Sequence, residues 1–149
     1  MAERLLTDVI GLDWHLVHEE ACRWEHVIST DVERRLVAIL DHPVSSPYGN
    51  PIPALEELGV EPAAESFLDG SETLSFRLAD GQPHEVVMRR MSESIQADPR
   101  LLTALEAAGA LPGIPVRAVA AGRTVLLGSG DRETVVPSDV AEHLFVAIS

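Results

Sequence analysis

The feature that most constrains the fold is a change in hydrophobic pattern near residue 60. Residues 3–59 place apolar side chains three or four positions apart, the spacing of amphipathic helices. From residue 72 onward, short segments with apolar alternation or β-branched content are separated by Gly, Pro and Asp. We therefore predict an α+β protein with a helical domain over residues 1–60, a small, acidic linker over 61–71 and an SH3-like β-barrel over 72–149.

Three helices and an ordered loop are predicted in the first part. The first helix covers residues 3–10 and ends at Gly11, and Asp13 is placed to cap the second. The apolar stripe of the second helix consists of Val17, Ala21, Trp24 and Ile28. Thr30 and Glu33 have the spacing of a capping box, which predicts the start of the third helix. The proline-rich "HPVSSPYGNPIP" that follows must be a loop or a series of turns.

Five strands and one inserted helix are predicted in the second part. Asp98 as N-cap, Pro99 at the first helical position and Gly109 just past the end define that helix. The predicted strands are residues 72–79, 84–91, 115–121, 123–129 and 133–137.

The charge of the chain limits its partners. Eleven arginines, no lysines and 24 acidic residues leave a formal net charge of −13. DNA affinity depends largely on cationic side chains that neutralise phosphates, so this acidic chain is a poor DNA ligand by itself. Its apolar runs are too short to span a bilayer. We expect a cytoplasmic protein that binds cations and protein partners.

The stretch "HEEACRWEH" at residues 18–26 concentrates potential metal ligands. On a helix running over residues 13–28, His18, Cys22 and His26 follow one another at intervals of four, and Glu25 lies beside them. Sulfur, imidazole nitrogen and carboxylate oxygen together suit a divalent transition metal better than calcium or magnesium. One helix cannot supply a complete coordination shell, so such a site would need ligands from elsewhere.

Two other interpretations of this stretch stay open. Amphipathic helices often carry a polar edge beside the apolar face, and a cysteine there is commonly an inert small apolar residue. Alternatively, Cys22 could be a nucleophile activated by a neighbouring histidine. The sequence has no oxyanion-hole motif near it, and two residues on one helix turn make poor geometry for a catalytic cleft. We therefore favour a protein that is not an enzyme.

A longer stretch resembles a known family. "AERLLTDVIGLDWHLVHEEACRWEHVISTDVERRLV" and "SPYGNPIPALEELGV" together are similar to the middle domain of the diphtheria toxin repressor and iron-dependent regulator family. Residues 72–149, including "SESIQADPRLLTALEAAGALPGIPV", resemble the C-terminal SH3-like domain of that family more loosely. The resemblance implies a dimeric transcriptional repressor activated by a metal, mainly Fe²⁺, with Mn²⁺ in some relatives and Co²⁺, Ni²⁺ or Zn²⁺ able to bind in vitro.

The resemblance also implies two metal sites. The primary site would use the cysteine, glutamate and histidine of the C-R-W-E-H motif, which are Cys22, Glu25 and His26. The ancillary site would use Glu3, His18, Glu93 and Gln96. The family's winged-helix DNA-binding domain, which supplies a further ligand to the primary site, has no counterpart in these 149 residues. We therefore expect weakened metal binding and DNA contact only through that missing domain.

Three functions follow from these observations. The first is the metal-sensing and dimerisation portion of a metal-dependent repressor, which forms a homodimer. The second is a dominant-negative partner that forms a heterodimer with a full-length repressor. The third is a stand-alone metal-binding or adaptor protein that does not contact DNA.

Overall fold

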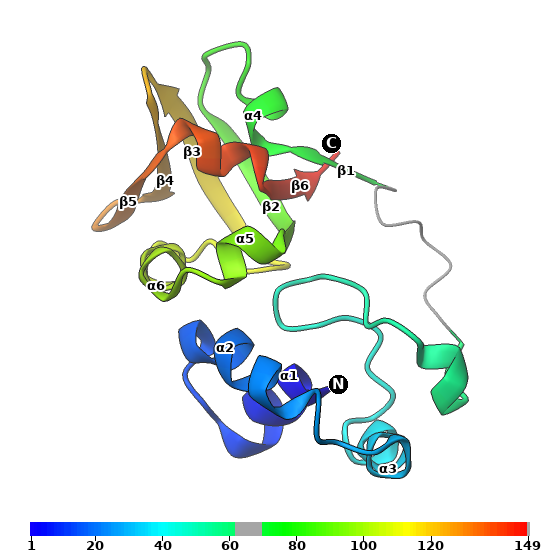
Figure 1. The fold of residues 1–149 in the computed structure, drawn as a ribbon. Helices are drawn as coiled ribbons and strands as arrows, with labels where there is room; N and C mark the ends of the chain where they lie inside the picture. Colours follow the sequence, from blue (N-terminus) through cyan, green and yellow to red (C-terminus); the bar gives the residue numbers. More distant parts are fainter. Residues whose placement is uncertain (62–69, 149) are drawn as a thin grey trace.

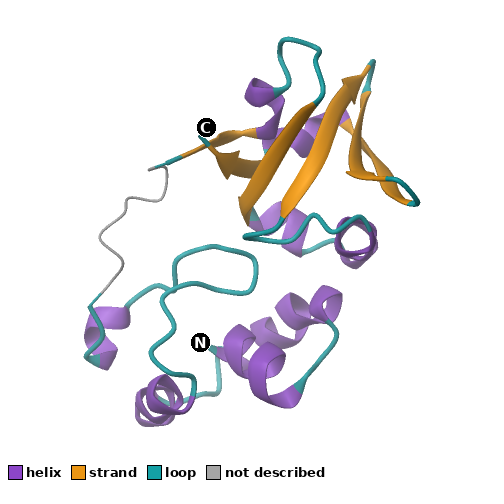
Figure 2. Ribbon diagram, turned by 180° about the vertical axis from the view of Figure 1, so that it is seen from behind, coloured by secondary structure: helices purple, strands orange, loops and turns teal. Residues whose placement is uncertain are grey.

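The computed structural model describes residues 1–61 and 70–148, and the greater part of the predicted linker lies outside them. Helices of the N-terminal part lie beneath a twisted sheet in the view of Figure 1, and Figure 2 shows the same arrangement from behind. The helical elements before the sheet are α1 (Ala2–Leu5), η1 (Leu6–Ile10), α2 (Trp14–Trp24), α3 (Thr30–Ile39) and η2 (Leu55–Leu58). No helix in the described ranges is long and apolar enough to cross a membrane.

The first turns follow the predicted boundaries closely. α1 continues directly into the π-helical turn η1, and Gly11 ends it with a φ of 74°, a left-handed conformation that glycine adopts without steric cost. Asp13 occupies the N-cap position of α2 as predicted, although its side chain makes no capping hydrogen bond. α2 ends at Trp24, so the predicted continuation to residue 28 is wrong.

The start of α3 differs from the predicted capping box by one residue. The N-cap is Ser29, whose hydroxyl accepts a hydrogen bond from the Val32 amide. Thr30 is the first helical residue instead. Both are good capping residues, and the extended backbone of Ser29 (φ −74°, ψ 157°) places its hydroxyl correctly.

The second part forms a six-stranded antiparallel sheet in the order β1-β6-β2-β3-β4-β5. Its strands are β1 (Ser71–Thr73), β2 (His84–Met91), β3 (Pro115–Ala121), β4 (Thr124–Ser129), β5 (Arg132–Pro137) and β6 (Leu144–Ala147). The intervening helical segments are α4 (Leu74–Arg77), α5 (Glu93–Gln96), α6 (Pro99–Ala107) and η3 (Ser138–Glu142). The expected α+β class is therefore confirmed, with one strand more than predicted.

Two local predictions in the sheet region need correction. Residues 72–79 were expected to be one strand, but β1 ends at Thr73, whose hydroxyl accepts from the Phe76 amide and caps α4. β6 was not predicted, and it inserts between β1 and β2. The helix at Pro99 is confirmed, because Asp98 accepts hydrogen bonds from the amides of Arg100 and Leu101.

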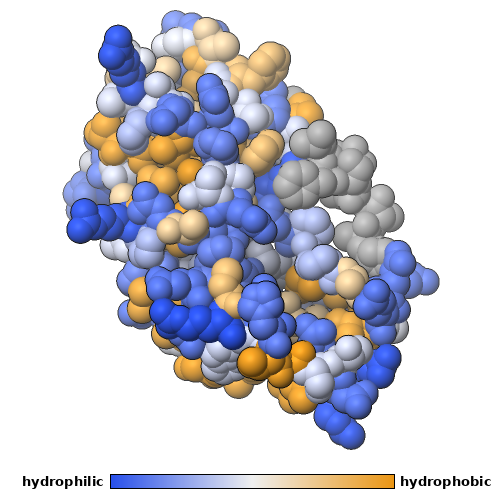
Figure 3. Space-filling view, viewed as in Figure 1, coloured by the Kyte–Doolittle hydropathy of each residue, from blue (hydrophilic) through white to orange (hydrophobic). Residues whose placement is uncertain are grey.

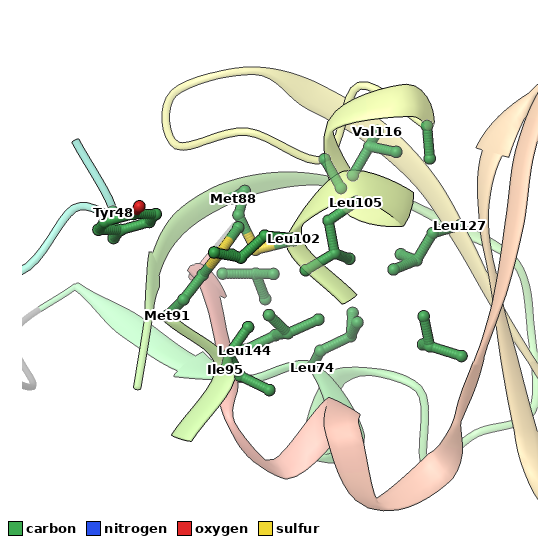
Figure 4. Packing of buried hydrophobic residues seen from close by; sticks show 14 of the residues in the cluster. Tyr48, Leu74, Met88, Met91, Ile95, Leu102, Leu105, Val116, Leu127 and Leu144 are labelled. Carbon is green, nitrogen blue, oxygen red and sulfur yellow. The ribbon is translucent and has the colours of Figure 1, made fainter. Parts of the chain in front are cut away.

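The main hydrophobic core joins the sheet to the N-terminal helices. In Figure 4, Leu102 and Leu105 of α6 lie among Met88, Val116 and Leu127 of the strands. The same cluster of buried residues includes Ala2, Leu6, Val17 and Ala21 from α1, η1 and α2. A smaller cluster consists of Val37, Ile52, Leu55 and Val60. The first two helices are thus packed against the sheet region, while α3 and η2 form a separate small core.

Several apolar side chains of the N-terminal part remain on the surface. Val32 and Ile39 of α3 are 48% and 64% exposed, and Leu36 between them is buried. Figure 3 shows apolar side chains along the lower edge of the molecule, where the N-terminal helices lie in the same view of Figure 1. Within one chain, α3 therefore buries only part of its apolar face.

Candidate metal centre

The predicted ligands surround a pocket between the N-terminal helices and the sheet region. Its volume is about 530 Å³, and α1, α2, α5 and the loop over residues 46–53 contribute to its wall. The lining residues are Met1, Glu3, His18, Cys22, Glu25, Ser46, Asn50, Pro51, Ile52, Pro53, Glu93 and Gln96. The structure therefore brings together all seven predicted ligands except His26.

Glu3, His18 and Cys22 form a chain of contacts along one wall of this pocket. Oε1 of Glu3 lies 2.9 Å from Nδ1 of His18. On the other side of the imidazole ring, Nε2 lies 3.7 Å from Sγ of Cys22, one helical turn further along α2. The side chains of Glu3 and His18 are only 14% and 17% exposed. A carboxylate, an imidazole and a thiol thus lie in sequence along one wall.

The thiol of Cys22 lies in a negative environment. Cys22 is an exposed residue, but desolvation of its thiol and then the carboxylates of Glu25, Glu3, Glu93 and Glu19 raise its pKa above the ordinary value. The thiol is therefore held protonated more firmly than a free cysteine, which is the opposite of what a nucleophile needs. The same negative groups would favour a cation in the pocket.

The helix α1 is fixed to the loop that closes the pocket. The guanidinium of Arg4 donates to the carbonyl oxygens of Ser45 at 2.7 Å and Ser46 at 3.3 Å. An isolated antiparallel β-bridge between Ser45 and Pro51 holds the two ends of the loop together. Glu3 of α1 and Asn50 of the loop both line the pocket.

Gln96 enters the pocket from the sheet side. Its side chain is almost fully buried, and Nε2 donates to the Met91 carbonyl at 2.9 Å. Nδ2 of Asn50 donates to the same carbonyl at 2.6 Å. Asn50 and Tyr48 of the loop were not singled out from the sequence, where "YGN" between prolines gave only a turn signal.

His26 does not line the pocket. The expectation of a continuous stripe from His18 through Cys22 to His26 fails because α2 ends at Trp24, and His26 lies in the following turn. His26 is exposed, whereas Glu25, the C-cap residue, still reaches the pocket. The assignment of His26 as a primary-site ligand therefore stays a prediction.

The residues present fit a divalent metal by their chemistry. Within residues 1–61 and 70–148, no three His, Cys, Asp or Glu side chains converge closely enough to form a ready ion-binding group. The donors that share the pocket nevertheless combine sulfur, nitrogen and oxygen, as borderline transition metals prefer. Glu3 and Cys22 contact different nitrogens of the His18 ring, so the carboxylate and the thiol lie at opposite edges of the imidazole.

Comparison with known proteins points to a family of metal-dependent repressors. Residues 1–54 match the family model described as "Iron dependent repressor, metal binding and dimerisation domain". The iron-dependent repressor IdeR of Mycobacterium tuberculosis is 46% identical over 150 residues, which cover 98% of this chain and 64% of the relative. The diphtheria toxin repressor of Corynebacterium glutamicum is 45% identical over 131 residues, covering 87% of this chain and 56% of the relative.

A solved structure extends the comparison to the fold. The crystal structure of T. acidophilum IdeR superposes with a TM-score of 0.71 at 26% identity, covering 99% of this chain and 63% of that one. These relatives are named as repressors rather than enzymes, and the chain spans somewhat less than two thirds of the length of the curated relatives it matches. The match of residues 1–54 to the family model and the identities over most of the chain show that it belongs to the family of the iron-dependent repressors and the diphtheria toxin repressors.

Proposed function

We propose that this chain is the metal-sensing and dimerisation portion of a divalent-metal-dependent transcriptional repressor that controls metal homeostasis genes. The observation that carries the proposal is the pocket in which Glu3, His18 and Cys22 make consecutive contacts while Glu93 and Gln96 face them from the sheet side. Donors from α1, α2 and α5 thus share one space. The affinity of this pocket for a cation would therefore depend on how the sheet region packs on the helices.

Two groups of ligands are proposed within and beside the pocket. Glu3, His18, Glu93 and Gln96 form the ancillary group, which the Glu3–His18 contact and the shared pocket support. Cys22, Glu25 and His26 form the primary group, of which the first two line the pocket. His26 would have to turn toward Cys22, and its exposed position after the end of α2 allows this movement.

The proposed metal is Fe²⁺, with Mn²⁺ as the alternative. A bound divalent ion would supply positive charge that compensates the carboxylates around Cys22. The thiol and imidazole favour iron and its neighbours, so Co²⁺, Ni²⁺ and Zn²⁺ are expected to bind in vitro and to bind more tightly than Mn²⁺. The protein's own part is to hold its donor side chains on three elements in one acidic pocket.

Metal binding would be coupled to the arrangement of the elements. An ion that binds one arrangement more tightly than another shifts the population toward it, by as much as its difference in affinity. Here the elements that carry the donors are joined by the main core, so the favoured arrangement is the one with the sheet region packed on α1 and α2.

The proposed active species is a homodimer. The matched family model is described as a metal-binding and dimerisation domain, and Val32 and Ile39 leave an exposed apolar face on α3. A heterodimer with a longer repressor chain would use the same face. Because the net charge is −13, we propose that DNA is contacted by residues outside this sequence. We also propose that the protein acts in the cytoplasm.

A metal titration tests the proposal. Co²⁺ or Mn²⁺ is added to the metal-free protein while binding heat and light scattering are recorded, and saturable binding by a dimer is expected. His18→Ala should weaken binding strongly, whereas His143→Ala removes an exposed histidine that does not line the pocket and should have no effect. Absence of saturable binding, or equal loss in both variants, would refute the function.

A further inference from the structure

Tyr48 connects the two sides of the pocket although its side chain does not line it. The loop of residues 45–51 lies between α2 and the end of β2, and the side chain of Tyr48 is fully buried at its centre. Figure 4 shows the ring of Tyr48 at one end of the main core, next to Met88 and Met91. A buried phenol needs hydrogen-bond partners, and these partners define what Tyr48 does.

The hydroxyl of Tyr48 contacts the turn of α2 that carries His18. It donates to the Trp14 carbonyl at 2.6 Å and accepts from the His18 amide at 3.1 Å. Trp14 and His18 are four residues apart, so the Trp14 carbonyl and the His18 amide are the acceptor and donor that face each other across one helical turn. The Tyr48 ring also lies 5.0 Å from the Trp14 ring and stands edge-on to the imidazole of His18. Tyr48 therefore fixes the backbone from which His18 projects.

The backbone of Tyr48 contacts the opposite wall. Its carbonyl accepts from the Met91 amide at 3.1 Å. The carbonyl of Met91 in turn accepts from Asn50 and Gln96, which both line the pocket. A single residue thus links His18 on one side to Asn50 and Gln96 on the other through Met91.

The close approach of the loop depends on Gly49. Its φ is 85°, and an added Cβ would lie 1.9 Å from the Arg89 carbonyl oxygen. Only glycine allows the loop to lie this close to β2. The position of Tyr48 is therefore set by both neighbours, α2 and β2, rather than by the loop alone.

We infer that Tyr48 is a positioning residue that sets the spacing between the helical and sheet-side donors before a metal binds. This inference rests on the function proposed above. Removing the hydroxyl leaves the His18 amide and the Trp14 carbonyl without their shared partner, and the donors then have to be ordered when the ion binds. Tyr48→Phe keeps the ring and its packing, so it isolates the hydroxyl.

The test compares the Co²⁺ affinity and the Co²⁺ absorption spectrum of the wild-type protein, Tyr48→Phe and Leu127→Ala. We expect Tyr48→Phe to weaken binding about three- to tenfold, the scale of one lost net hydrogen bond, and to alter the visible absorption bands. Leu127→Ala removes a fully buried side chain from β4, outside the pocket, and lowers stability without moving the donors. Its affinity and spectrum should match the wild type.

A second readout needs no metal. In the metal-free protein, the amide proton of His18 should exchange with solvent faster in Tyr48→Phe than in the wild type, while amides in β4 keep their rates. Wild-type affinity, spectrum and exchange in Tyr48→Phe would overturn the inference and leave the proposed function standing. Absence of Co²⁺ binding to the wild-type protein would overturn both.

Discussion

Nδ1 of His18 and Oε1 of Glu3 lie 2.9 Å apart, and this contact joins the first helical turn of the chain to the middle of α2. It leaves Nε2 of the same imidazole facing Cys22. One ring therefore relates a carboxylate and a thiol that are nineteen positions apart in the sequence.

Glu3→Gln should weaken divalent-metal binding. The change removes a negative charge beside His18 while keeping the shape of the side chain. Even hydrogen-bonded partners of metal ligands alter affinity about tenfold or more, so we expect a loss of at least that scale in a Co²⁺ or Mn²⁺ titration. Glu56→Gln makes the same charge change at an exposed position in η2 that does not line the pocket. Equal losses in both variants would mean that only net charge matters.

Cys22 should react slowly with alkylating reagents near neutral pH. Desolvation of the thiol and the surrounding carboxylates raise its pKa, so the reactive thiolate appears only at higher pH than in a free cysteine. The midpoint of the pH–rate profile with iodoacetamide is expected above that of a model thiol. Glu25→Gln should lower this midpoint, because among the surrounding carboxylates that of Glu25 raises the pKa of the thiol most. A midpoint at or below that of a free thiol would contradict the negative environment of Cys22.

Gly49→Ala should destabilise the protein by roughly 2–3 kcal/mol, since strain from a left-handed backbone and a clash with β2 add together. Gly113→Ala is the matched control: its φ of 83° is similar, but nothing lies within 4 Å of its added Cβ. The free energy of unfolding from urea titration should fall less in the control, by about 1 kcal/mol. The difference measures how closely the loop packs on Arg89.

Ser29→Ala should cost about 1 kcal/mol, because the hydroxyl of Ser29 caps α3 through the Val32 amide. Thr30→Ala changes the first helical residue and should have a much smaller effect on urea unfolding. If Thr30→Ala lowered the free energy of unfolding more than Ser29→Ala, Thr30 would be the N-cap, as the sequence pattern predicts.

Local signals in the sequence predict many elements correctly. Gly11 ends the first helical segment, and Asp98 with Pro99 begins α6, since caps and breakers act on their nearest neighbours. The clustering of donors on α2 is likewise visible in the sequence. The same local signals are ambiguous where two good capping residues are adjacent, as at Ser29 and Thr30.

Tertiary relationships could not be predicted in this way. β6 pairs with β1 and β2, and no local pattern specifies a partner more than fifty residues away. The contact of Tyr48 with α2 depends on how the loop of residues 45–51 folds back onto the helix. The gathering of Glu93 and Gln96 beside His18 also depends on the packing of the sheet region, and only the resemblance to a family pointed to it.

The insertion of β6 between β1 and β2 has a consequence for synthesis of the protein. A nascent chain that has emerged only as far as residue 143 has both strands but not the one that separates and joins them. Until residues 144–147 leave the ribosome, β1 and β2 each present an unsatisfied backbone edge to neighbouring chains. Loss of residues 144–147 would therefore make the polypeptide prone to self-association during translation.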